Sequence, residues 1–191
     1  PYETKFIAGA RAEQNAEDWW SSLVTATQIC LKEANIRGNA IDAMAYATTC
    51  CTVVALDKNG APLRSALMWM DVRADKEAEA ILETGDQRLI LNGNGQGPVS
   101  AEWMIPKALW LRRNEPKIFD DAVTICEYQD YLTMRLTGER CASLNNVGLR
   151  WHYANRDGGW ASGIVEKLGI PDLLEKWPSR VAAPGEVVGN L

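Results

Sequence analysis

Residues 62–73 read PLRSALMWMDVR, an apolar strand whose last positions turn polar. Successive residues of a strand point to opposite faces of the sheet. We therefore expect Trp69, Asp71 and Arg73 to lie on one face, where they would present an aromatic wall, a carboxylate and a guanidinium. A buried Asp71–Arg73 ion pair with no further role is the alternative interpretation.

The elements around this stretch alternate as an α/β protein requires. Residues 52–56 are expected to pair with 63–70 through the turn at 57–60, since its Asn-Gly supplies the positive φ angles of a hairpin. Asn15 predicts the cap of a helix that ends near residues 35–38 and carries apolar side chains along one face. The same patterns predict further buried strands at 40–48 and 123–127. They also predict helices at 74–83, 100–114, 129–136 and 160–168.

Length and composition predict one core. The chain has 191 residues, of which 47% are hydrophobic, enough for one domain and an appendage. No apolar run reaches the ~20 residues that cross a bilayer, and the first five residues lack a signal pattern, so a cytoplasmic protein is expected. A net charge of −5, spread along the chain, leaves no basic stripe. Neither nucleic acid nor a membrane is therefore expected as a partner.

The five cysteines form an odd set without paired C-x-x-C spacing. This pattern favours neither a zinc site nor a disulfide framework, and no metal site is predicted. Reduced, mostly buried thiols are the expectation. A nucleophilic pair of a cysteine with His152, the single histidine, stays open.

A glycine-rich run at residues 92–98, NGNGQGP, could in principle cradle a phosphate. A phosphate loop needs backbone N–H groups at a helix N-terminus and usually a Lys or Ser/Thr beside them. This run ends in Pro98 without Gly-Lys-Ser/Thr. We interpret it as a connector that lets residues 100–107 move over a site.

Three later segments extend the motif WMDVR of residues 69–73. They read SAEWMIPKALWL at 100–111, DYLTMRLTGE at 130–139 and GLRW at 148–151. In this order and at about these spacings, the four motifs resemble those of the FGGY family of carbohydrate kinases, from about Tyr2 to Leu191. Within the family the likeness is greatest to the ribulokinase-like branch, which carries a Ser-x-Glu-Trp-x-x-Pro-Lys segment and a Thr-Cys pair, here Thr49-Cys50.

The resemblance implies an α/β fold of the ribonuclease-H-like, actin-like ATPase class. Residues 1–191 would form part of the amino-terminal, sugar-binding domain, incomplete because the first phosphate-binding strands would precede Pro1. The catalytic Asp and the nucleotide-binding domain would follow Leu191. The implied activity is ATP-dependent phosphorylation of a ketopentose, ribulose or xylulose, or a related polyol, with Mg²⁺ in the complete enzyme. This chain alone is expected to bind neither cofactor and to be inactive; a homodimer is compatible with the family.

The resemblance also implies which side chains hold the sugar. Thr48, Thr49 and Cys50 fall where the family lays a turn against the sugar, and small side chains suit a close approach. Ala47 stands where the ribulokinase-like pattern often has an Asp. Glu102 would accept hydrogen bonds from sugar hydroxyls; its alternative is a solvated acid favoured by the start of a helix.

Aromatic and cationic side chains complete the implied site. Trp103 and Trp151 would form apolar walls against the C–H side of the sugar, although tryptophans are more often core residues. Arg150 replaces a ribulokinase Lys, so a planar fork replaces a point donor. Lys107 and Asp130 are expected to be structural, the latter as a helix cap.

Trp69, Asp71 and Arg73 are expected to support this site, with Asp71 orienting Arg73 rather than acting as the base. Two alternatives to the ketopentose kinase remain. One is a non-catalytic sugar-binding or regulatory module on the same scaffold. The other is a glycerol- or hexose-type kinase of the family, against which Glu102 and Arg150 argue.

Overall fold

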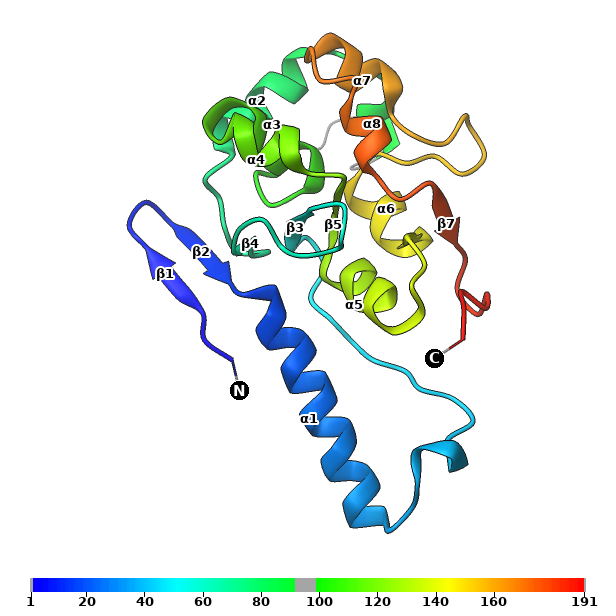
Figure 1. Cartoon of the computed structure of the whole chain (residues 1–191). Coiled ribbons are helices and arrows are strands. Elements are labelled where there is room, and N and C mark those ends of the chain that lie inside the picture. Colours follow the sequence, from blue (N-terminus) through cyan, green and yellow to red (C-terminus); the bar gives the residue numbers. More distant parts are fainter. Residues whose placement is uncertain (1, 92–98, 191) are drawn as a thin grey trace.

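The centre of the protein is an antiparallel sheet (Figure 1). The computed structural model describes residues 2–91 and 99–190. Within them the sheet order is β1 (Lys5–Ile7), β2 (Arg11–Gln14), β4 (Ala66–Leu67), β3 (Val53–Leu56) and β5 (Thr124–Glu127). A separate parallel pair joins β6 (Cys141–Ser143) to β7 (Arg180–Ala182). The glycine-rich run 92–98, predicted to be a connector, lies outside the described residues.

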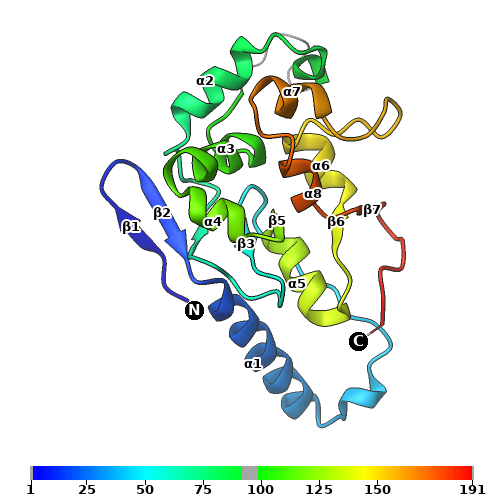
Figure 2. The same ribbon diagram turned by 45° about the horizontal axis from the view of Figure 1, so that its top comes forward.

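The helices gather on both sides of this sheet. Figure 1 shows α2, α3 and α4 grouped together above the sheet. Both views show α5 near the first turns of α1 (Figures 1 and 2). Their bounds are α1 (Ala16–Ala34), α2 (Asp75–Glu83), α3 (Met104–Asn114), α4 (Pro116–Asp121), α5 (Tyr128–Thr137), α6 (Leu144–Arg150), α7 (Ser162–Lys167) and α8 (Leu173–Lys176). The helices expected from the sequence are therefore present, within a few residues at each end.

The predicted hairpin is confirmed, but its second strand is shorter than expected. Asp57 and Gly60 form the turn, in which Gly60 has a positive φ of 78°. The second strand ends at Leu67, because the chain then turns so that the Asp71 N–H donates to the Met68 carbonyl at 3.0 Å. Trp69 is consequently 41% exposed and Asp71 is fully buried. The prediction that Trp69, Asp71 and Arg73 share one strand face is wrong.

The strand predicted at 40–48 is also wrong. Residues 38–40 form a short 3₁₀ helix, and residues 41–49 then run without regular structure back toward β3. A strand needs a neighbour to satisfy its backbone N–H and C=O groups. This segment has no hydrogen-bonded neighbouring strand in the described part of the chain, and its side chains stay exposed or half-buried.

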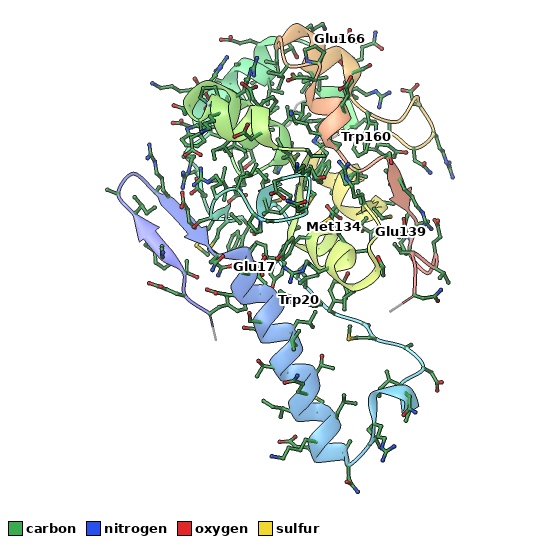
Figure 3. All side chains as sticks on the ribbon, in the orientation of Figure 1. Glu17, Trp20, Met134, Glu139, Trp160 and Glu166 are labelled. Atoms are coloured by element: carbon green, nitrogen blue, oxygen red, sulfur yellow. The ribbon has the colours of Figure 1, made fainter. Side chains whose placement is uncertain are left out.

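Helix α1 has the predicted cap and length. The Asn15 side chain accepts the Glu17 N–H at 3.2 Å, and Asn35 ends the helix in the left-handed conformation. Its first turns are anchored: Trp19 stacks on Tyr128 at 3.8 Å between ring centroids. Figure 3 shows Glu17 and Trp20 at this anchored end, close to α5. Beyond it the apolar face is only half-buried or exposed, because α1 extends away from the body (Figure 1).

Candidate functional site

The candidate sugar-binding turn lies immediately before β3. Thr49 and Cys50 are exposed and Thr48 is half-buried, so all three can be reached from solvent. The Thr49 and Thr52 hydroxyls lie 3.1 Å apart, and the Trp69 N–H donates to the Thr52 hydroxyl at 3.1 Å. The Thr52 hydroxyl therefore joins this turn to the segment that carries Trp69.

Buried charges fix the other side of the same turn. Glu127, at the end of β5, accepts the Cys51 N–H at 2.9 Å. Lys107, on α3, donates from Nζ to the Cys51 carbonyl at 2.7 Å and to the Met68 carbonyl at 2.6 Å. Both side chains are completely buried. The peptide groups on the two sides of Cys51 are thus held from two directions.

Burial shifts the protonation equilibria of these groups. Burial lowers the pKa of Lys107 to about 8, against the opposing charges of Cys51, Asp71 and Glu127. Burial also raises the pKa of Glu127, which its hydrogen bonds from Trp151 and the Cys51 N–H oppose. The Lys107 ammonium and the Glu127 carboxylate carry opposite charges in one water-free region. Each therefore offsets part of the free-energy cost of desolvating the other.

Trp103 and Arg150 form the aromatic and cationic part of the site. The Arg150 guanidinium carbon lies 5.4 Å from the centroid of the Trp103 ring, within the range of a cation–π contact. His152 meets the same ring edge-on at 5.5 Å. Trp103 is mostly buried, and its ring contacts both Arg150 and His152. Arg150 is half-buried and keeps access to solvent.

Glu102 directly precedes Trp103 and is half-buried. The Ser100 hydroxyl lies 3.4 Å from its carboxylate, and the Glu102 N–H donates to that hydroxyl at 3.3 Å. This turn delays α3, which starts at Met104 rather than at Ser100. Glu102 therefore stands before the helix, and its carboxylate keeps capacity to accept hydrogen bonds from a ligand.

Asp71 and Arg73 form a buried ion pair, and their support of the sugar site stays a prediction. The Asp71 carboxylate accepts from Arg73 at 2.7 Å and from the Ala12 N–H at 2.7 Å. Burial works against this carboxylate, but the hydrogen bonds and charge of Arg73, together with the Ala12 N–H, hold the pKa of Asp71 below its usual value. Arg73 also pairs with Glu13 at 2.8 Å. The pair ties β2 to the end of the hairpin.

Trp151 does not form an open apolar wall. It is fully buried, and its indole N–H donates to Glu127 at 2.7 Å. Its ring packs against Trp160 and Trp177, with centroids 5.8 and 5.7 Å away. The prediction of a sugar contact is wrong for Trp151; its role is to satisfy and shield Glu127.

Glu127 is the residue that sequence reasoning missed. In the sequence it is only the last residue of the strand predicted at 123–127. The signal is nonetheless present, since an acid at the last position of a buried strand is costly to bury unless it has specific donors. Asp130 is confirmed as a cap: its carboxylate accepts the Glu127 N–H at 3.0 Å and the Ser143 N–H at 3.2 Å, and burial raises its pKa to about 8.

A large hollow lies elsewhere, between residues 41–46, α5, β6 and residues 182–190. None of the sequence-predicted site residues lines it. The pattern of candidate contacts therefore points to the Cys51 turn and not to this hollow.

Residues 1–191 match the model of the FGGY family of carbohydrate kinases, N-terminal domain, in full. The chain belongs to the FGGY family of carbohydrate kinases. This confirms the family suggested by the motifs at residues 69–73, 100–111, 130–139 and 148–151.

Individual FGGY relatives agree with this assignment. Xylulose kinase of Streptomyces rubiginosus is 30% identical over 189 residues, which cover 96% of this chain and 37% of the relative. Ribulokinase 1 of Staphylococcus saprophyticus is 29% identical over 195 residues, covering 93% of the chain and 36% of the relative. The chain thus spans about a third of the length of the curated relatives it matches.

The fold agrees as well. A solved structure of a xyloylose kinase from Brucella ovis superposes with a TM-score of 0.84 at 22% identity, covering 98% of this chain and 38% of that one. The expected fold class, the ribonuclease-H-like α/β fold of these kinases, is confirmed, and the chain covers its amino-terminal part.

The family implies Mg²⁺ and ATP, and the described residues show no preformed cluster of ligands for the Mg²⁺. Within residues 2–91 and 99–190, no three His, Cys, Asp or Glu side chains converge as metal ligands. Asp71 and Glu127 both face inward and already accept N–H donors. In the same ranges, no helix is long and apolar enough to cross a membrane.

Proposed function

We propose that this FGGY chain is the acceptor-binding part of an ATP-dependent kinase that phosphorylates a ketopentose, ribulose or xylulose, or a related polyol. One observation carries the proposal. Lys107 holds the carbonyls of Cys51 and Met68 from α3, so the small-residue turn, Trp69 and the Trp103 end of α3 are fixed around one point. The xylulose kinase and ribulokinase relatives support a pentulose as the acceptor.

The side chains around this point suit a polyhydroxylated chain. Thr48, Thr49 and Cys50 would allow the carbon backbone of the sugar to approach closely. Glu102 would accept hydroxyl hydrogens and Arg150 would donate to hydroxyl oxygens. An acceptor held at several points reacts faster, because binding has already fixed the orientation of its attacking hydroxyl.

The phosphoryl donor requires metal ligands, and no three His, Cys, Asp or Glu side chains converge within residues 2–91 and 99–190. We propose that ATP, Mg²⁺ and the general base are supplied by segments outside residues 1–191, as the domain organisation predicted from the resemblance implies. The 191-residue chain would then be an incomplete sugar-binding domain and would have no kinase activity by itself.

An assay of ADP release tests this function. The intact protein should release ADP with ribulose, xylulose or a matching polyol, and the 191-residue chain should give only background. Sugar-dependent ADP release by the 191-residue chain that persists after repurification would overturn the proposal that ATP, Mg²⁺ and the base are supplied from outside residues 1–191.

The same assay separates the other candidate functions. Glycerol or a hexose preferred by more than about tenfold in kcat/KM would overturn the pentulose assignment. An intact protein that binds pentulose but never releases ADP would be a non-catalytic binding module.

A further inference from the structure

Cys51 has a left-handed backbone conformation that its burial alone does not explain. Its φ is +61°, in the left-handed region that residues other than glycine rarely adopt. A left-handed cysteine persists only when its surroundings hold it there. Two elements that lie far from Cys51 in sequence, α3 and β5, hold it through Lys107 and Glu127.

The holding contacts are specific to the Cys51 peptide groups. Glu127 takes the N–H and Lys107 takes the carbonyl. Lys107 makes no ion pair within 4 Å in the described residues. Its ammonium is instead satisfied by two backbone carbonyls, those of Cys51 and Met68. A buried lysine that only needed a counter-ion would be expected beside a carboxylate.

These two carbonyls belong to the two segments that carry candidate sugar contacts. Cys51 directly follows Cys50, and Met68 directly precedes Trp69. The third segment is α3 itself, since Trp103 lies one turn before Lys107, whose N–H donates to the Trp103 carbonyl at 3.3 Å. A shift of Lys107 would therefore move all three segments relative to one another.

We propose that Lys107 and Glu127 are positioning residues of the sugar site. They hold the Cys51 turn in its left-handed conformation and thereby set the distance between Cys50, Trp69 and Trp103. Neither touches the sugar, because both are completely buried. The inference rests on the proposed function for the identity of the ligand, but the clamp on Cys51 can be measured without it.

The first test replaces Lys107 by Met in the intact protein. Met keeps the apolar length and removes both hydrogen bonds. We expect the sugar KM to rise about tenfold or more while the ATP KM changes less than about twofold, since a displaced acceptor contact acts on one substrate. Lys176→Met is the matched control: Lys176 also donates to a backbone carbonyl, that of Ala122 at 2.8 Å, but lies outside the site.

The second readout is native alkylation by iodoacetamide, located by mass spectrometry. In the wild type Cys30 and Cys50 are exposed and should react, whereas Cys51, Cys126 and Cys141 are buried. Burial raises the pKa of Cys51 to about 12. Releasing the turn should make Cys51 react about tenfold faster, because exposure restores its thiolate, while Cys126 and Cys141 stay protected.

A Lys107→Met protein that does not fold is replaced by Glu127→Gln. One amide oxygen cannot serve both the Cys51 N–H and the Trp151 indole N–H as the carboxylate does, so the same two changes are expected in weaker form. Two controls recognise a general loss of stability. The melting temperature of Lys107→Met is compared with that of Lys176→Met, and Cys126 and Cys141 would also become reactive if the whole domain loosened.

The outcomes separate the clamp on Cys51, its role in positioning the sugar site, and the proposed function. Unchanged alkylation of Cys51 in the folded variants overturns the clamp. Faster alkylation with an unchanged sugar KM overturns its role in positioning. Faster alkylation in a protein whose wild type phosphorylates no sugar supports the clamp and overturns the proposed function instead.

Discussion

The candidate site has two layers that differ in what surrounds them. An inner layer of Cys51, Lys107, Glu127 and Trp151 is buried and saturated with hydrogen bonds. An outer layer is reachable from solvent and comprises Thr48, Thr49, Cys50, Trp69, Glu102 and Arg150. Neighbours in sequence fall into opposite layers, as with Cys50 and Cys51 or with Arg150 and Trp151. The comparison teaches that one residue step separates a buried, hydrogen-bonded side chain from one that a ligand can reach from solvent.

The largest effect is expected from Trp151→Ala. It removes a fully buried ring and leaves the Glu127 carboxylate without its indole donor, so unfolding should become easier by about 3–5 kcal/mol. Denaturant unfolding measures this loss. Arg150→Ala, one residue away, is the matched control and should cost less than about 1 kcal/mol. Equal losses for the two variants would erase the distinction between the layers.

Asp71→Asn should cost about 3 kcal/mol at neutral pH, because it leaves the Arg73 guanidinium paired only with Glu13. The pH dependence has a defined sign. The pKa of Asp71 is lower folded than unfolded, so its stabilisation is complete above the unfolded value near 3.8 and is lost as pH falls through the folded value. Thermal melts from pH 2.5 to 7 should show wild type and variant converging in acid. A constant difference across this range would contradict the ion-pair role.

Glu102→Gln belongs to the outer layer and should leave stability almost unchanged. Losing the charge while keeping the shape should lower kcat/KM for the sugar by the equivalent of about 1–3 kcal/mol. Kinetics with sugar and ATP varied separately measure the split, because ATP binding should be unaffected. An unchanged sugar KM and kcat would remove Glu102 from the proposed contacts.

Arg150→Lys is expected to have the smallest effect. The positive charge stays over Trp103, but a point donor replaces the fork, so ratios of kcat/KM among ribulose, xylulose and their polyols should change by less than about tenfold. Arg150→Ala should lower all of them. Substrate ratios measured beside thermal melts decide the matter: an unchanged ratio with a lower melting temperature would move Arg150 to the inner layer.

The sequence predicted the helices and the hairpin because their signals are local. Asn15 and Gly60 act on their own turns, and each occupies the expected cap or turn. The strand at 40–48 failed because an apolar pattern does not specify a partner strand. The alternation of Trp69, Asp71 and Arg73 failed for a related reason, since the hairpin stops at Leu67.

The candidate site was predictable only in its outer layer. Family motifs pointed to Glu102 and Arg150, and those roles stay predictions. The inner layer depends on contacts between distant segments, which no local pattern encodes. Lys107 was expected to be structural without a partner being named, and its partners are two carbonyls that the sequence cannot mark.

The clamp on Cys51 also has a consequence for synthesis of the chain. Lys107 is separated from Cys51 by 56 positions and Glu127 by 76. A nascent chain that has left the ribosome only as far as the end of α3 can form the β3–β4 hairpin, but it has no acceptor for the Cys51 N–H. The left-handed turn is therefore completed when β5 joins β3, and contacts of this range close late and slowly. A chaperone that bound the nascent chain before that step would meet a sugar-binding surface not yet assembled.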